Sequence, residues 1–465
     1  MHTNQVYSEV VTVNNGSHKW WHRRWMKIIG IFIILLIVSA IILALVLNFV
    51  VFAPTISEIN TTASPSSSSL ATTISTLPSS STTTSTMTPT TTLAQTTTTS
   101  TTEQSEPTTT TTSITVSTTT PTTMSTTTTA VQEWVVTGNM SAARYIHTAS
   151  VLENGFVLIT GGNNGSTVFN SAELYNPSTD NWTTTGSMNV ARFGHTSSTL
   201  ANGLVLVAGG RNGTAVSLNN AELYNPSTDT WTTTGSMSVA RWYHTASTLA
   251  NGLVLVAGGS GNGGILNSSE LYNPSTGIWI TTENLNAVRI AHTASTLANG
   301  FILVAGGVSS NDVYVNSAEL YNPSTGTWTS TGNLNFARAY HTASTLANGL
   351  VLVSCGRDAI TVLNSAELYN LSTGTWTTTG NLNFARVAHT TSTLANRKVL
   401  VTGGLQDSIT LDSAELYNPS AGTWTSTGSV TIARYGHTAA TLANGKVLVT
   451  GGQNSDGYLN SAELY

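Results

Sequence analysis

The sequence predicts an all-β domain, a seven-bladed β-propeller, that follows one transmembrane helix and a disordered Ser/Thr-rich stalk. Three observations support this prediction. A unit of 48 or 49 residues recurs seven times between residues 134 and 465. Each unit carries about four strand signals, and no helical period interrupts them. Repeats of this length with four strands each are typical of β-propellers.

The N-terminal part of the chain predicts a membrane anchor. Residues 1–27 are polar and form a predicted cytosolic tail, whereas residues 28–52 contain no charge and are long enough to cross a bilayer as one helix. This apolar run is longer than that of a cleaved signal peptide, which favours an uncleaved signal-anchor. Four basic residues precede the span and none follows it until Arg144. We therefore expect a single-pass type II protein, with its C-terminal part extracellular or lumenal and the plasma membrane favoured over the Golgi.

Residues 53–130 are mostly Ser and Thr with scattered Pro. Such a segment cannot bury enough apolar surface to fold. Outside the cell it is typical of an O-glycosylated, mucin-like stalk, with an unmodified linker as the alternative.

The composition excludes nucleic acid as a partner and a disulfide as a source of stability. Only 8% of the residues are charged and the net charge is −5, so no basic field exists to attract nucleic acid. The single cysteine, Cys355, excludes an intramolecular disulfide. No segment gives an obvious oligomerisation signal. Stability must therefore come from packing and from closure of the ring.

Several positions are the same in every unit. Each unit contains a Trp, an Arg-x-x-His motif, an apolar run that closes in glycine, and a Glu within AELY or SELY. The Trp residues are Trp134, Trp182, Trp231, Trp279, Trp328, Trp376 and Trp424. The Arg residues are Arg144, Arg192, Arg241, Arg289, Arg338, Arg386 and Arg434. The Glu residues are Glu173, Glu222, Glu270, Glu319, Glu367, Glu415 and Glu463.

The four strand signals of a unit differ in character. HTASTL is short and built of small residues, while LVLVAGG is continuously apolar, as expected of a strand buried on both faces. NSAELYNP alternates and ends in an Asn-Pro turn. WTTTGSM is polar and Thr-rich, as expected of an edge strand.

These features resemble the kelch repeat. Six units carry a double glycine after the apolar strand, followed by the Tyr and the Trp, and the fifth unit departs with Cys355-Gly356. The resemblance covers 134–465, within a predicted propeller domain of 131–465, and implies blades whose strands a to d run outward from the centre. HTASTL is then strand a and the Trp segment is strand d. The chain would open this domain with an orphan strand d at 134–140 and end in a blade that lacks one, so pairing of the two would close the ring.

Positions shared by all units are expected to serve the scaffold. The Trp residues should pack between blades, and the Arg and Glu residues should form a repeated, partly buried charge pair, with an anion-binding ring as the alternative. The seven histidines that follow the Arg residues suit structural hydrogen bonds, with metal binding or pH sensing as the alternative. Cys355 is expected to be a small buried thiol.

Variation is concentrated in two sets of loops, b–c and d–a, which the kelch resemblance places on one face. Exposed aromatic and charged side chains there suit recognition of a protein or a glycan, with loop drift as the alternative. The predicted ligand-binding face comprises Tyr145, Phe193, Arg211, Trp242, Tyr243, Asp312, Tyr314, Tyr340, Arg357, Asp358 and Tyr435.

The sequence thus predicts an extracellular binding module without catalytic residues, cofactor or metal. The alternative is a copper radical oxidase of the galactose-oxidase type, because Tyr243-His244 and Tyr340-His341 offer candidate ligand pairs. Sequons predict N-glycans at Asn60, Asn164, Asn212 and Asn267.

Overall fold

The computed structural model describes residues 133–214 and 216–465. Within this part of the chain, every extended strand belongs to one of seven four-stranded antiparallel sheets or to one of three short hairpins. No α-helix occurs among these residues, and so no helix in them has the length and apolar character needed to cross a bilayer. The predicted cytosolic tail (1–27), transmembrane helix (28–52) and stalk (53–130) lie outside the described residues.

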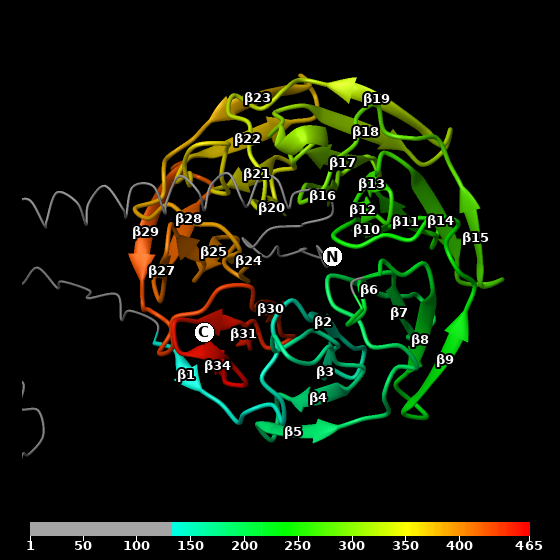
Figure 1. Ribbon diagram of the computed structural model, residues 1–465. Coiled ribbons are helices and arrows are strands. Elements are labelled where there is room, and N and C mark those ends of the chain that lie inside the picture. Colours follow the sequence, from blue (N-terminus) through cyan, green and yellow to red (C-terminus); the bar gives the residue numbers. More distant parts are fainter. Residues whose placement is uncertain (1–132, 215) are drawn as a thin grey trace, which may run out of the picture. The chain divides into compact units, whose positions relative to one another are not determined.

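Seven sheets form the blades of a propeller, so the predicted fold class is confirmed for the described residues. Figure 1 shows them arranged around a centre, with the first strand of each blade innermost and the fourth outermost. The first three blades comprise β2 (Thr148–Val151), β3 (Val157–Thr160), β4 (Ala172–Asn176) and β5 (Asn181–Thr184); β6 (Thr196–Thr199), β7 (Val205–Ala208), β8 (Ala221–Asn225) and β9 (Thr230–Thr234); and β10 (Thr245–Thr248), β11 (Val254–Ala257), β14 (Ser269–Asn273) and β15 (Ile278–Thr281).

The next three blades repeat this order. They comprise β16 (Thr293–Thr296), β17 (Ile302–Ala305), β18 (Ala318–Asn322) and β19 (Thr327–Thr331); β20 (Thr342–Thr345), β21 (Val351–Ser354), β22 (Ala366–Asn370) and β23 (Thr375–Thr378); and β24 (Thr390–Thr393), β25 (Val399–Thr402), β28 (Ala414–Asn418) and β29 (Thr423–Thr427).

Blade seven is assembled from both ends of the domain. It comprises β30 (Thr438–Thr441), β31 (Val447–Thr450), β34 (Ala462–Leu464) and β1 (Val135–Val136). Strand β1 is antiparallel to β34, with Val135 opposite Leu464 and Val136 opposite Glu463. The two strands lie side by side in Figure 1 although one is the first and the other the last of the domain. The predicted closure of the ring is therefore confirmed.

Burial follows the strand chemistry predicted from the repeats. The second strand of every blade is buried at all four positions, and its residues are almost all aliphatic. The fourth strands are mostly exposed and rich in Thr. Seven hydrophobic clusters fill the spaces between adjacent blades, and an eighth lies apart from them in the d–a and b–c loops.

Each Trp connects its blade to the preceding one. Trp231 packs on Tyr224 of its own blade with ring centroids 5.1 Å apart, and its Nε1 donates to the carbonyl of Gly186 at 2.7 Å. Trp328 differs, because Glu283 occupies the position that Gly186 holds in blade one. Its indole N–H donates to the hydroxyl of Ser269 instead. Trp134 completes the series by donating to Gly428 of blade six.

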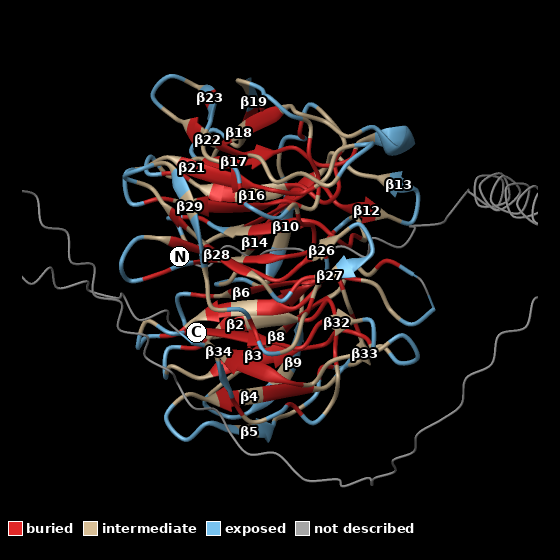
Figure 2. Ribbon diagram, turned by 90° about the vertical axis from the view of Figure 1, so that its left-hand side faces the viewer, coloured by how far each residue is buried: buried red, intermediate tan, exposed pale blue. Residues whose placement is uncertain are grey.

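The loops between strands b and c lie on one side of the ring. They include the short helix η1 (Ser310–Asp312) and three hairpins, which are β12 (Ser260–Gly261) with β13 (Gly264–Ile265), β26 (Leu405–Gln406) with β27 (Ile409–Thr410), and β32 (Gln453–Asn454) with β33 (Gly457–Tyr458). Figure 2 shows these hairpins together on the same side, with exposed tips. The a–b and c–d turns point to the opposite side.

Candidate binding face

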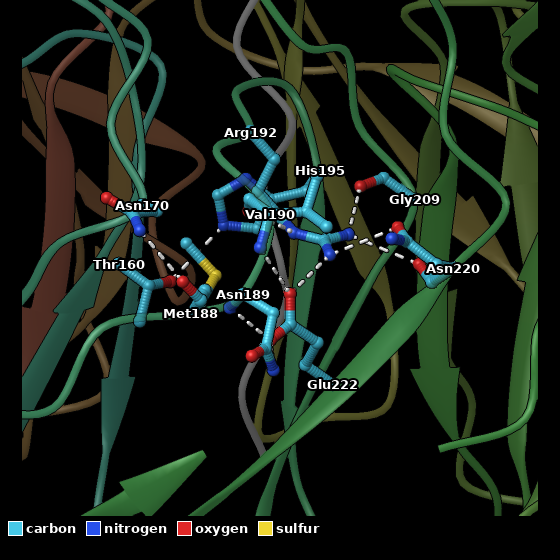
Figure 3. Close-up of polar contacts among 10 residues, drawn as sticks. All are labelled: Thr160, Asn170, Met188, Asn189, Val190, Arg192, His195, Gly209, Asn220 and Glu222. Atoms are coloured by element: carbon cyan, nitrogen blue, oxygen red, sulfur yellow. Dashed lines mark hydrogen bonds and ion pairs between the residues drawn. The ribbon is translucent and has the colours of Figure 1, made fainter. Parts of the chain in front are cut away.

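A buried ion pair stands at the start of each blade. In blade two, Arg192 Nη2 lies 2.8 Å from Glu222 Oε1, and Arg192 Nη1 donates to the carbonyl of Gly209 at 2.7 Å (Figure 3). The other oxygen of Glu222 accepts the backbone N–H of Asn189 at 2.6 Å. Since Asn189 belongs to the loop arriving from blade one, the pair connects two blades.

All seven blades contain this pair, with N–O distances of 2.5–2.9 Å and no exposure of the arginine side chains. Burial lowers the pKa of Arg192, and the charge and hydrogen bond of Glu222 oppose that shift. Each guanidinium is fully buried and is paired with a carboxylate of its own blade. This burial and pairing support the structural interpretation of the ring of charges.

The seven histidines form a second ring of contacts between blades. His244 Nε2 is hydrogen-bonded to Thr196 Oγ1 of the preceding blade at 3.0 Å, and the last blade meets the first through Thr438 and His147 at 2.9 Å. Burial, followed by the charge of the nearby arginine, lowers the pKa of every one, that of His292 to about 3. Burial therefore favours the neutral form of these imidazoles. Among the described residues, no group of three or more His, Cys, Asp or Glu side chains is arranged to hold a metal ion.

The d–a and b–c loops lie together, as the repeat pattern predicts. In each blade the residue after the arginine pairs with the first residue of the b–c loop, as Tyr145 does with Asn163 and Trp242 with Ser260. Phe193 and Arg211 form the same bridge in blade two. The two sets of variable loops therefore make one continuous surface.

Three predicted face residues are not exposed, which corrects the sequence-based interpretation. Tyr145, Trp242 and Tyr243 are only 2–3% exposed and belong to the eighth hydrophobic cluster. Trp242 stacks on Tyr243 with ring centroids 4.2 Å apart, and the guanidinium of Arg211 lies 4.7 Å from the indole centroid. These rings are part of the packed interior and cannot act as an exposed aromatic pair.

This cluster joins loops from many blades. Its buried members are Tyr145, Ile146, Trp242, Tyr243, Ile290, Ala291, Val308 and Ala339. The residue before each histidine has a left-handed backbone, with φ between 50° and 62°. Backbone hydrogen bonds join such residues from blade to blade, for example from Tyr243 N to Gly194 O at 2.9 Å. The loops thus form a packed layer beneath the face.

Glycine makes room for the large rings in this layer. At Gly436, with φ of 62°, an added Cβ would lie within the ring of Tyr145. Ala291 and Ala388 adopt the same backbone at the corresponding positions of their blades. The requirement for glycine at 436 therefore comes from the neighbouring ring and not from the backbone alone.

The remaining predicted face residues are partly accessible. Asp312 is exposed, and the half-buried members are Phe193, Arg211, Tyr314, Tyr340, Arg357, Asp358 and Tyr435. The guanidinium of Arg357 lies 5.8 Å from the ring centroid of Tyr314, so blades four and five meet through a cation–π contact. Whether these residues bind a ligand stays a prediction.

The structure shows a set of exposed apolar residues that the sequence analysis did not identify. We call it the apolar arc, and it comprises Val313, Phe336, Ile360, Phe384 and Ile409, which are 42–87% exposed. The residues alternate between b–c and d–a loops of blades four to six. Phe336 and Phe384 occupy the position held by Val190 and Val239 in other units, so comparison of the copies could have found them.

Backbone hydrogen bonds join the loops that carry the apolar arc. Phe336 lies between Leu334 and Arg338, whose backbone N–H groups donate to Asn316 and Val315 in the b–c loop of blade four. Ala339 then pairs with Arg357 in the b–c loop of blade five.

The same pattern continues into blade six. Leu382 and Arg386 flank Phe384 and donate to Asn364 and Leu363 of blade five. Val387 pairs with Leu405, at the start of the hairpin that contains Ile409. The five residues therefore lie on successive, hydrogen-bonded loops of one sector of the face.

Cys355 is fully buried at the position of the first glycine of the pair, with φ of 60°. It packs in the cluster between blades five and six, and burial raises the pKa of its thiol to about 12. A protonated, enclosed thiol is a poor nucleophile. The side chain behaves as the small buried thiol that the sequence predicts.

The fold and these repeated contacts define a seven-bladed propeller of kelch type. A model of the KLHDC2/KLHL20/DRC7 Kelch-repeats domain matches residues 146–333 and 291–465. The chain belongs to the kelch-repeat family. No significant match was found among curated proteins.

A solved structure with a similar fold is described as a novel fungal alcohol oxidase with catalytic diversity among the AA5 family, in complex with copper. The TM-score is 0.61 with 19% sequence identity, over 72% of this chain and 76% of that chain. At this identity the likeness concerns the fold alone.

The residues of this chain do not fit the copper centre considered above. His244 and His341 use Nε2 to bond Thr196 and Thr293 of neighbouring blades. Cys355 packs between blades five and six, whereas Tyr243 and Tyr340 belong to the cluster of the face. The sulfur and the tyrosines that a crosslinked radical centre requires are thus in separate clusters.

Proposed function

We propose that this chain is a single-pass type II membrane protein whose kelch propeller acts as an extracellular protein-binding module, without enzymatic activity. The N-terminal sequence supports the topology, and the family supports protein binding. The plasma membrane is the proposed location.

One observation supports the site of binding. Ten large apolar residues are prominently exposed in the described part of the chain. Four lie on outer strands, at Val135, Val136, Ile278 and Ile280, and none lies on the a–b and c–d turns. The other six are Val216 and the five members of the apolar arc. Contiguous exposed apolar surface marks sites of interaction with other molecules.

The chemistry of the apolar arc favours a protein over a glycan. Its members are aliphatic or phenyl side chains, which a protein partner can bury by dispersion and by exclusion of water. Asp312, Arg357 and Asp358 lie beside it and offer polar contacts at a rim. The rings of Tyr145, Trp242 and Tyr243 beneath this face are buried, so we expect the partner to contact the loop tips.

A binding screen with residues 131–465 against arrays of surface proteins and of glycans tests this proposal. The arc variant Ile360→Thr/Ile409→Thr should weaken binding of a captured protein at least about tenfold, corresponding to about 1.4 kcal/mol. The matched control is Ile278→Thr/Ile280→Thr, which removes two exposed isoleucines from the outer strand of blade three. Equal affinities of the two variants would place the site elsewhere, and capture of glycans alone would contradict the protein-binding function.

A further inference from the structure

The c–d turn of blade five differs from the same turn in the other blades. Five turns read Asn-Pro-Ser, beginning at Asn176, Asn225, Asn273, Asn322 and Asn418, and the sixth reads Asn370-Leu371-Ser372. Asn-x-Ser is an acceptor sequence for N-glycosylation only where x is not proline. The replacement of one proline by leucine thus creates an acceptor sequence that the other turns lack.

The turn at Asn370 leaves the reactive nitrogen without a hydrogen-bond partner among the described residues. Asn370 Oδ1 accepts hydrogen bonds from the backbone N–H of Ser372 at 2.9 Å and from its hydroxyl at 2.6 Å. No described residue accepts a hydrogen bond from Asn370 Nδ2. The asparagine is half-buried, and Ser372 and Thr373 are exposed. A substituent on Nδ2 therefore breaks no hydrogen bond of the fold.

Asn267, a sequon predicted above, has a different environment. Its Nδ2 donates to the carbonyl of Leu285 at 3.1 Å, and Asn219 and Asn316 make the same bond in their blades. The amide of Asn267 is thus part of the repeated scaffold, whereas that of Asn370 is not. This contrast ranks Asn370 above Asn267 as an acceptor.

We propose that Asn370 carries an N-linked glycan, an inference that rests on the extracellular topology proposed above. The donor is an oligosaccharide linked to a lipid diphosphate. A bond forms between Asn370 Nδ2 and the anomeric carbon while the bond from that carbon to the diphosphate oxygen breaks. Nδ2 loses one proton, and the lipid diphosphate leaves with the electron pair.

The position of this glycan agrees with the proposed binding site. Asn370 lies at the end of β22, in a c–d turn, and Ile360 lies in the b–c loop of the same blade. Figure 2 shows the b–c hairpins on one side and the end of β34, another strand c, on the opposite side. A glycan at Asn370 therefore covers the side away from the apolar arc and leaves the arc free to bind.

The test is site-resolved glycopeptide mapping of the full chain produced by a eukaryotic cell through its secretory route. Ser372→Ala should lose the glycan while it keeps the turn and Leu371. A second variant, Leu371→Pro, restores the turn sequence of blade four and should also lose it. The reciprocal variant Pro323→Leu reproduces the blade-five sequence in blade four and should gain a glycan at Asn322.

Two results would overturn the inference, and they differ. An unmodified Asn370 peptide in a molecule glycosylated at Asn164 or Asn212 would refute this site and leave the extracellular topology standing. A chain with no glycan at any propeller sequon would contradict the topology itself. Mapping separates Asn370 from the other sequons of the propeller, which are Asn139, Asn164, Asn181, Asn212 and Asn267.

Discussion

Mild acid should unfold the propeller, because seven buried histidines are neutral in the folded state. Burial and a nearby arginine lower the pKa of each, and that of His292 falls to about 3. In the unfolded chain these side chains have an ordinary pKa of about 6.5. As the pH falls below 6.5, the unfolded state binds protons that the folded state does not, so the stability present at higher pH is progressively lost.

The size of the loss follows from the number of histidines. Between pH 7.5 and 5.5, each histidine whose folded pKa lies well below this range removes about 1.4 kcal/mol of stability. Seven such groups remove about 10 kcal/mol, which is comparable with the whole free energy of unfolding of many domains. Carboxylates contribute mainly below about pH 5, outside this window.

Denaturant titrations of residues 131–465 at pH 7.5, 6.5 and 5.5, followed by tryptophan fluorescence, measure this loss. His244→Gln serves as the control, because it removes one titrating group while offering Thr196 another hydrogen-bonding side chain. This variant should be less stable at pH 7.5 but should lose about 1.4 kcal/mol less on acidification. A stability that stays constant from pH 7.5 to 5.5 would refute the assignment of neutral histidines.

Three further predictions concern stability. Deletion of 131–140 removes β1 and exposes the edge of β34, so we expect aggregation or a large fall in melting temperature. Deletion of an equal length of the stalk is the control. An equal fall in melting temperature for both deletions would argue against ring closure. Arg192→Met leaves Glu222 buried without its partner and should lower the free energy of unfolding by about 3–5 kcal/mol in denaturant melts. A decrease under about 1 kcal/mol would count against the buried ion pair. Gly436→Ala should lower the free energy of unfolding by about 2–4 kcal/mol, because the added methyl group clashes with the ring of Tyr145. The decrease should be much smaller in a Tyr145→Ala background, and equal decreases in both backgrounds would exclude this clash as the cause.

The sequence predicted the scaffold well because the information is local and repeated. A buried strand such as Val254–Ala257 is uniformly apolar, and the Arg and Glu of each unit occur once per blade. The closure of blade seven also follows from counting strands. Each of these inferences depends on a pattern within one unit or on its number of copies.

Exposure on the binding face could not be predicted in the same way. Trp242 and Tyr243 occupy variable loop positions, and we expected their rings to face solvent. They are buried because loops from distant parts of the chain meet, so that residues such as Ile290 and Val308 cover them. The substitution of both by Ala is therefore expected to reduce stability, in contrast to the prediction from sequence.

The apolar arc was missed for the opposite reason. Phe336 and Phe384 follow an asparagine in otherwise regular d–a segments, and aromatic residues near a core motif are easily assigned to packing. Their exposure, 47% and 42%, results from the path of the loop across the face. Only the three-dimensional arrangement brings them beside Ile360 and Ile409.

Site-specific photo-crosslinking in living cells tests the central claim most directly. A photoreactive amino acid replaces Ile360 in the apolar arc or, as the matched control, Ala347 in the exposed a–b turn of the same blade. We expect a discrete protein adduct from position 360 and none from position 347. The absence of an adduct specific to position 360, or an adduct from position 347 alone, would contradict the proposal that the propeller binds a protein through this face.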